Sequence, residues 1–531
     1  MEAVSQLDRD TLRALAAIRE WKNSFALINR IPTDILSLIP THLTSQKGLF
    51  HTASVCRHWR RVLLENGALW SQLFLIKGED YLSTLLERAK GSALDIVADH
   101  RAPASSLTLI SSRAQQIRSL EFTKSYWRDI ITFSESNSGR LPLIRILKIS
   151  TLDPYIVDGQ PNVVTPPPLP FFRGSINLKR FVFHSGMISL LNHFVFPNLT
   201  TFELSTHQAE VCSALHLLEF LKASPMLQTV EVKVPPVTLR GVPREMVVVL
   251  PNVETFSLYV APTTRVYDIA AHISCPCARY ASLTHGMYDT HMGADVIFPA
   301  PVSWNAIIHQ YTASPIEEVT LDVEDLECFL TFQSSDTTMV RVNFEVIQFG
   351  VHESLLDMSH EEMGWSIFCA ALETIQDRPL LSHVKRLHIK YNESMSNPYD
   401  KGCWMIEGVR DLFNSLEPLD ELIIDGCDLR IFLAEFLADL GLNDPERPIV
   451  FPHIKQLTIL LPSRNTDDTR CMAAIVELAK SQHALGIPFE RVKLRVWDNP
   501  GGMAEKLRRW VTGTVVCRHV MEPWPSEFGG V

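Results

Sequence analysis

The chain has 531 residues and a formal net charge of −11 at pH 7, with 46% hydrophobic and 21% charged residues. This length exceeds the size at which one globular core stops growing, so we expect several domains or a repeat array in a folded protein. The mild acidity argues against nucleic acid as a partner. No run approaches the ~18 apolar residues of a membrane-spanning helix, which argues against a membrane.

Ten cysteines are scattered over the chain, which fits buried thiols in a reducing compartment better than a disulfide framework. The first 25 residues are charged throughout and lack the apolar segment of a signal peptide. We therefore expect an intracellular protein, in the cytoplasm, the nucleus or both.

The first predicted element is an amphipathic helix over residues 5–27, which with the preceding residues forms an N-terminal segment, 1–27. Its apolar stripe has spacings near three and four and consists of Leu7, Leu12, Leu15, Ile18, Trp21 and Phe25. Barely three heptads is short for a coiled coil. We therefore favour packing of this helix against the module that follows.

A second helix is expected to start at Pro32, because the fixed φ of proline suits a first helical turn, and to end or kink at Pro40. A further helical segment is expected from Leu49 through Leu63. Asn66-Gly67 predicts its end, because glycine adopts the left-handed cap conformation easily. A segment this short cannot bury so many large apolar groups alone, so it faces a partner or caps the next domain as a helical hairpin.

The order of motifs over residues 28–76 is similar to the F-box family. The matching residues are Ile31, Pro32, Asp34, Ile35 and Leu36, then Val55, Cys56, Arg57 and Trp59, then Leu69 and Trp70. Asp34 stands where Glu is commoner, and the link 41–50 is longer and more polar than the family's.

This resemblance implies a three-helix module that docks on the Skp adaptor of a Skp–cullin–F-box ubiquitin ligase. By motif position, the residues that would contact the adaptor are Ile31, Pro32, Ile35, Leu36, Val55, Cys56 and Trp59. An amphipathic face that fills an apolar channel is the physical basis of such docking, and aromatic anchors usually dominate its energy.

From residue 77 to 531 a short signature recurs, apolar-x-x-apolar-x-apolar, often after a proline. Its copies are IRSLEF (117–122), IRILKI (144–149), LKRFVF (178–183), PNLTTFEL (197–204), PMLQTVEV (225–232), PNVETFSL (251–258), IEEVTL (316–321), VKRLHI (384–389), LDELII (419–424), IKQLTI (454–459) and FERVKL (489–494). The last four begin 35 residues apart, which indicates a periodic array. The alternation predicts a short strand with one buried face.

Two intervals, 253–316 and 316–384, are about double length. Each holds a degenerate repeat, for which CARYAS near 277 and MVRVNF near 339 are the candidates, or an inserted loop. Helical patterns at 210–224, 429–441 and 471–486 lie between the strands. The Pro-rich stretch 151–175 predicts a long insertion between repeats, with a partner-binding tether as the alternative.

Helix, turn and L-x-x-L-x-L strand in repetition resemble an irregular leucine-rich repeat solenoid. The resemblance implies an α/β array of about 13 units, with parallel strands on a concave sheet and helices outside. The Asn/Cys position after the strand is mostly missing, apart from Cys427. Several separate α/β domains are the alternative, which the 35-residue register disfavours.

No catalytic or cofactor motif is present in the sequence: G-x-x-x-x-G-K-S/T, G-x-G-x-x-G, H-E-x-x-H and G-x-S-x-G are all missing. Cys275 and Cys277 lack a second ligand pair for zinc, and Cys403 and Cys427 fit core thiols. We expect no enzyme, no cofactor and no metal.

These features together predict a substrate receptor, which holds a protein target on the outward residues of the sheet. The candidate target-binding residues are Glu203, Glu231, Lys233, Tyr259, Asp322, His388, Lys390, Asp425, Lys493, Arg495 and Trp497. Three other classes stay open: an interaction scaffold outside a ligase, a small-molecule sensor with a pocket in the sheet, and an enzyme built on the repeats.

Overall fold

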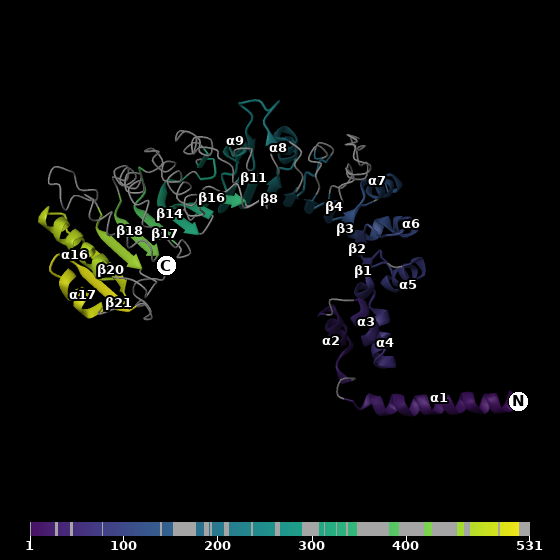
Figure 1. Cartoon of the computed structure of the whole chain (residues 1–531). Helices are drawn as coiled ribbons and strands as arrows, with labels where there is room; N and C mark the ends of the chain where they lie inside the picture. Colours follow the sequence, from purple (N-terminus) through teal and green to yellow (C-terminus); the bar gives the residue numbers. More distant parts are fainter. Residues whose placement is uncertain are drawn as a thin grey trace, which may run out of the picture. The chain divides into compact units, whose positions relative to one another are not determined.

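The computed structural model describes most of the N-terminal half of the chain and shorter stretches after it. The described residues are 2–26, 30–42, 46–76, 78–137, 141–151, 177–184, 191, 194–206, 212–234, 237–260, 266–288, 307–308, 310–312, 314–324, 327–335, 338–347, 382–391, 419–426, 454–460, 468–496 and 500–519. The chain forms two compact units, residues 1–199 and 200–531. Figure 1 shows the helices and strands of the chain with their labels.

The chain begins with helix α1, Glu2–Ser24, in agreement with the predicted amphipathic helix. All six residues of the apolar stripe are exposed, among them Leu7, Ile18 and Trp21. The predicted packing of this stripe on the next module is therefore wrong. The described contact between the two is an ion pair in which Arg57 Nη1 lies 3.1 Å from Glu20 Oε2.

The helical module that follows contains three α-helices and two short 3₁₀ helices that lie wholly within the described residues. They are α2 (Thr33–Leu38), η2 (Ile39–His42), α3 (Gln46–Ala53), α4 (Arg57–Glu65) and η3 (Gly67–Trp70). The α-helical hydrogen bonding ends just before Pro40, as its position in the sequence predicts.

Two local predictions for this module are wrong. In place of the expected single helix after Leu49 there are two, α3 and α4. Cys56 has an extended backbone conformation (φ −158°, ψ 172°) that interrupts the helix, and α4 begins at the next residue. Among the described glycines with positive φ are Gly91, Gly241 and Gly486, and Gly67 is not one of them. Helix α4 therefore ends without the left-handed glycine cap that Asn66-Gly67 predicts.

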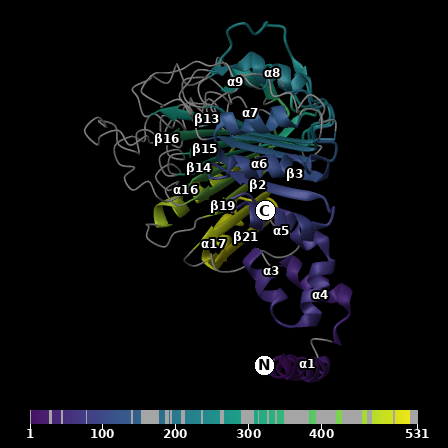
Figure 2. The ribbon, with the colours of Figure 1, turned by 90° about the vertical axis from the view of Figure 1, so that its right-hand side faces the viewer.

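The first unit continues with five parallel strands, each paired with the next in the chain where their register is described. The strands are β1 (Gln72–Phe74), β2 (Leu94–Asp99), β3 (Ile117–Ser125), β4 (Ile146–Thr151) and β5 (Arg180–His184). Between them lie α5 (Glu79–Ala89), α6 (Ala104–Ser111), η4 (Ala114–Gln116) and α7 (Trp127–Ser136). Helices α5, α6 and α7 lie on one side of these strands and face the viewer in Figure 2.

The second unit is a mostly parallel sheet. Its strands are β6 (Thr201–Ser205), β8 (Thr229–Val234), β11 (Thr255–Val260), β13 (Tyr280–Tyr288), β14 (Ile316–Glu324), β15 (Glu327–Ser334), β16 (Met339–Ile347), β17 (Arg386–Tyr391), β18 (Glu421–Gly426), β19 (Gln456–Leu460), β20 (Arg491–Val496) and β21 (Thr514–His519). Short strands β7 (Cys212–Ser213) and β9 (Val237–Thr238) pair with each other, as do β10 (Val248–Val249) and β12 (Ile273–Ser274). The helices within its described residues are α8 (Ala214–Lys222), α9 (Val266–Ala270), α16 (Asp468–Ala484) and α17 (Pro500–Leu507).

The spatial order of the central strands differs from their order in the chain. Strand β13 pairs with β16, β16 with β15, β15 with β14, and β14 with β17. The two candidate degenerate repeats are real strands, β13 and β16, which resolves the two double-length intervals. Strand β15 runs antiparallel to both of its neighbours, and nothing in the repeat signature predicts it.

Alternation along each strand separates two faces of the sheet, as the signature predicts. In β11, Phe256, Leu258 and Val260 are buried, whereas Thr255, Ser257 and Tyr259 are partly exposed. The predicted helices at 210–224 and 471–486 correspond to α8 and α16. The predicted helix at 429–441 and all but the first residue of the insertion at 151–175 lie outside the described residues. The architecture is therefore a helical module followed by parallel-sheet α/β structure, and a curved leucine-rich repeat solenoid stays a prediction.

Candidate partner-binding site

The helical module has a small apolar core of its own. Leu36 of α2 packs with Trp59 and Val62 of α4, and Ile31 and Cys56 lie against this cluster, partly buried. Leu36 is 1% exposed and Trp59 is 7% exposed. These two side chains hold α2 against α4, so their direct contribution to any partner contact is small in this conformation.

Other apolar side chains of the same module remain on its surface. Ile35 is 47% exposed and Val55 is 63% exposed, and Leu38 and Ile39 are also exposed. Ile35, Leu38 and Ile39 follow the i, i+3, i+4 spacing, so they share one helical face. The seven residues of the predicted adaptor contact therefore divide into exposed ones (Ile35, Val55 and Pro32) and ones that are buried or partly buried.

Sequence reasoning missed Leu38 and Ile39 as surface residues. Their spacing from Ile35 was visible in the sequence, but it equally fits a face that packs inward. The sequence does not show which side of α2 is covered by α4. The placement of α4 depends in turn on the break between α3 and α4.

The second candidate surface is one face of the sheet in the second unit. Glu203 is aligned with Glu231, which is aligned with Ser257, and Tyr259 is aligned with Lys233. Toward the C-terminus, Asp322 is aligned with Lys390, and the row continues through Asp425 and Leu460 to Arg495. His388 and Lys493 belong to the neighbouring row, which runs through Ile423 and Thr458. The described candidate target-binding residues therefore share one face, and Trp497 lies outside the described residues.

Charged side chains of this face are partly neutralised by their neighbours. Lys233 Nζ lies 2.9 Å from Glu231 Oε1, and Lys390 Nζ lies 3.7 Å from Asp322 Oδ2. Burial raises the pKa of Asp425, with a further increase from the charge of Asp322 and an opposing effect of Lys390. Positive and negative side chains therefore lie close together on this face. Such a face is complementary to a protein partner whose surface also carries both signs of charge.

His388 differs from the expected exposed position on this face. Its side chain is only 4% exposed, and its Nε2 has no hydrogen-bond partner within the described structure. Burial lowers the pKa of His388 to about 4, and the nearby charges of Lys390 and Arg386 act in the same direction. The ring is therefore neutral at pH 7, and although His388 lies on the predicted face of the sheet, its neighbours cover it.

The two described cysteines of the Cys275-Pro276-Cys277 motif do not form part of a metal-binding cluster among the described residues. Cys275 is buried, burial raises the pKa of its thiol to about 12, and Cys277 is exposed. No group of three or more His, Cys, Asp or Glu side chains with metal-binding geometry occurs in the described part of the chain. Cys403 and Cys427 lie outside it. None of the helices described is both long and apolar enough to span a bilayer.

Comparison with protein families identifies the helical module. Residues 28–76 match the F-box-like family, and these are the residues that build α2, α3, α4 and the two 3₁₀ helices. No curated protein matches the chain. The chain therefore contains an F-box-like domain, and the α/β part that follows is characterised by its structure alone.

Proposed function

We propose that the chain is the substrate-recognition subunit of a Skp–cullin–F-box ubiquitin ligase. Its F-box-like domain would bind a Skp-type adaptor, and through it the cullin, while the sheet would bind a target protein. The observation that carries this proposal is the match of residues 28–76 to the F-box-like family, on a module that exposes Ile35 and Val55.

Exposed apolar side chains on so small a module support a docking role. Ile35, Leu38 and Ile39 present one apolar face on two short helical segments. Burial of such a face in a partner's apolar channel gains roughly 25 cal/mol per Å² of apolar surface. Leu36 and Trp59 would then act by fixing the angle between α2 and α4, so that the exposed residues are presented together.

We propose that the chain contributes to ubiquitin transfer by holding the target close to the enzyme. The chain itself is proposed to be non-catalytic. Tethering a target near a ubiquitin-charged enzyme turns a bimolecular encounter into a local one. The mixed charges on the sheet, such as Glu231 with Lys233, fit a target that is a protein. We place this assembly in the cytoplasm, the nucleus or both.

The test is co-purification of the full chain with a Skp-type adaptor. Ile35→Asp and Val55→Asp each place a carboxylate where an apolar contact is proposed, and each is expected to weaken adaptor binding at least about tenfold, which is ~1.4 kcal/mol. Leu143→Asp is the matched control, because Leu143 is 49% exposed in the same unit and lies outside residues 28–76. Trp59→Ala is unsuitable, because it would empty the module's own core.

Circular dichroism of each variant separates lost docking from lost folding. Addition of the cullin to the adaptor complex then tests the ligase assembly. A ligase subunit is expected to recruit the cullin through the adaptor, whereas a scaffold outside a ligase would bind the adaptor and leave the cullin unbound. Failure of the wild-type chain to bind the adaptor would contradict the proposal.

A further inference from the structure

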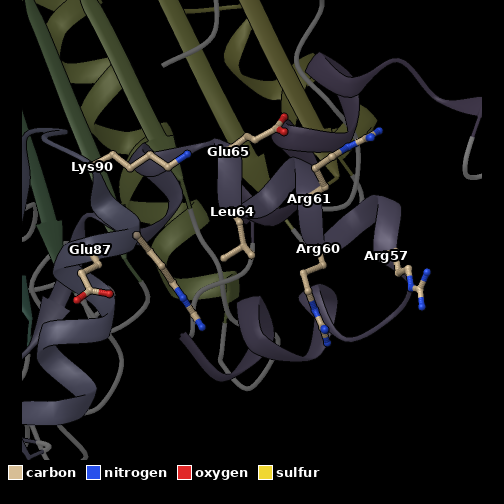
Figure 3. Close-up of a pocket in the computed structure, with 8 residues that line it drawn as sticks. Arg57, Arg60, Arg61, Leu64, Glu65, Glu87 and Lys90 are labelled. Atoms are coloured by element: carbon tan, nitrogen blue, oxygen red, sulfur yellow. The ribbon is translucent and has the colours of Figure 1, made fainter. Parts of the chain in front are cut away.

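A cationic groove lies between α4 and the end of α5. It has a volume of about 630 Å³ and is lined by Arg57, Arg60, Arg61, Leu64, Glu65, Glu87, Arg88 and Lys90 (Figure 3). Ligand sites in proteins typically measure roughly 300–1,000 Å³, so this groove is large enough to hold a ligand. Five cationic side chains and two carboxylates line it, in a chain whose net charge is −11.

The groove's own carboxylates do not neutralise its cations. Among the described contacts, neither Glu65 nor Glu87 forms an ion pair with an Arg or Lys side chain of the groove. Arg60 Nε instead donates a hydrogen bond to the Ala53 carbonyl at 3.1 Å. The lining therefore contains three more cationic than anionic side chains, and one of these cations, Arg57, is paired with Glu20 of α1.

Arg88 is held in position by two aromatic rings. Its guanidinium carbon lies 4.7 Å from the centroid of the Trp70 ring and 5.1 Å from that of Phe50. Phe50 and Trp70 also pack edge to face, with ring centroids 5.3 Å apart. A guanidinium held in this way loses little conformational freedom when it binds an anion, so this wall of the groove is pre-organised.

The arginines of α4 occupy positions that disfavour the helix itself. Arg57, Arg60 and Arg61 lie within the first two turns of α4, and the first turn carries no acidic residue. Cations near a helix N-terminus oppose the helix dipole, and like charges three and four residues apart repel each other. An anionic ligand in the groove would relieve both effects.

We propose that this groove binds an acidic peptide segment through its side-chain carboxylates. Arg57 and Arg61 are four residues apart, about 6 Å along the helix, and Arg88 and Lys90 stand on the other wall. Charges distributed in this way match several carboxylates along a chain better than one small anion. Arginine is suited to this role because its guanidinium binds a carboxylate through two hydrogen bonds.

A peptide fits the groove better than a nucleic acid does. Leu64 offers an apolar contact to a peptide side chain, and the residues that line the groove include no aromatic ring on which a base could stack. The ion pair between Arg57 and Glu20 of α1 is an example, within this chain, of a peptide carboxylate bound by a groove cation. The proposal does not rest on adaptor binding, because it uses neither Ile35 nor Val55.

The test measures binding of a fluorescent octaglutamate peptide to the full chain by anisotropy, with octaglutamine as the uncharged comparison. The triple variant Arg60→Glu, Arg61→Glu, Lys90→Glu is expected to weaken binding of octaglutamate at least about tenfold. The matched control reverses three exposed cations outside the groove, Arg113→Glu, Arg145→Glu and Arg244→Glu, and is expected to change the affinity less than about twofold.

Three results would overturn the proposal. Equal binding of octaglutamate and octaglutamine is the first, and equal weakening by the groove and control variants is the second. The third is a single-stranded oligonucleotide of eight nucleotides that binds more tightly than octaglutamate and loses affinity in the groove variant. Ile35→Asp is expected to leave peptide binding unchanged, so failure of this proposal and failure of adaptor docking are distinguishable.

Discussion

At the scale of single residues, position 67 has room only for glycine. A Cβ at this position would lie 2.5 Å from the carbonyl oxygen of Ala89 and 2.9 Å from Oγ of Ser92. The backbone of η3 therefore approaches the end of α5 more closely than any side chain permits. Trp70, three residues on, donates a hydrogen bond from Nε1 to the Leu63 carbonyl at 2.8 Å, which joins η3 to α4.

Gly67→Ala is expected to lower the free energy of unfolding by roughly 1–3 kcal/mol, because the Ala89 backbone must move. Gly78→Ala is the matched control, since a Cβ there meets nothing within 4 Å. Denaturant unfolding of both variants and the wild type measures the difference. Equal stability of the two variants would contradict the close approach.

A second residue-scale prediction concerns His388 and pH. Its folded-state pKa of about 4 is below the ordinary value of 6.5, so its unfolded form takes up a proton first as the pH falls. The contribution of the neutral ring to stability is complete above pH 6.5 and is lost between about pH 6.5 and 4, by up to about 3 kcal/mol. The charged groups nearest to it in the sheet register are Arg386 and Lys390 on its own strand, and Glu318, Asp322, Glu421 and Asp425 on the two neighbouring strands.

His388→Gln, which cannot take up a proton, is expected to make stability less dependent on pH over this range. His383→Gln is the control, because His383 is exposed. Denaturant unfolding at pH 7 and pH 5 gives the comparison. The same loss of stability on acidification in His388→Gln as in wild type would show that another group is responsible.

At the scale of elements, charged residues that enter the strands form a ladder across the sheet. Glu317, Lys385, Asp420, Lys455 and Glu490 alternate in sign from one strand to the next. Lys385 Nζ lies 3.0 Å from Glu317, and Lys455 Nζ lies 2.9 Å from Asp420. One residue further along, Arg386 bridges Glu318 and Glu421 at 2.8 and 2.9 Å. Cross-strand pairs of opposite charge favour this register over a shifted one.

Arg386→Met is expected to destabilise the second unit by about 1–2 kcal/mol, because it leaves the well-covered carboxylates of Glu318 and Glu421 without their shared partner. Lys480→Met removes an exposed pair with Glu477 and is expected to change stability by less than about 0.5 kcal/mol. Thermal unfolding at low and high salt compares the two. A loss in Arg386→Met no greater than that in Lys480→Met would contradict a structural role for the bridge.

At the scale of the whole molecule, each of the eleven clear copies of the repeat signature is a strand, and so are the two candidate degenerate copies, for which an inserted loop was the alternative. The signature works because burial of one strand face imposes an alternation that is visible in sequence. It did not mark β1, β2 and β21, the short strands β7, β9, β10 and β12, or β15, which joins the sheet in the opposite direction. The order β13, β16, β15, β14, β17 depends on long-range pairing, and no local pattern encodes that.

For the candidate sites, as for the strands, the sequence located the segments and did not show how they pack together. The F-box motif located the module, but which of its apolar residues face outward depends on how α4 packs on α2. The groove cations were visible as Arg57, Arg60 and Arg61, but their opposite wall, Arg88 and Lys90, lies more than twenty residues further along the chain. His388 followed the strand alternation and is nevertheless buried, because burial depends on neighbours in other strands.

The reversed order of the central strands bears on how the chain acquires its structure during synthesis. Where strands pair with the next repeat, a partner such as Glu421 for Arg386 emerges 35 residues later, and the sheet can grow one strand at a time. Arg386 and Glu318 are 68 residues apart, and β13 has no next neighbour until β16 has been made. The three strands β14, β15 and β16 must therefore form as one piece before growth resumes. We expect a pause in assembly on the ribosome at this point, with the edge of β13 exposed to chaperones while it lasts.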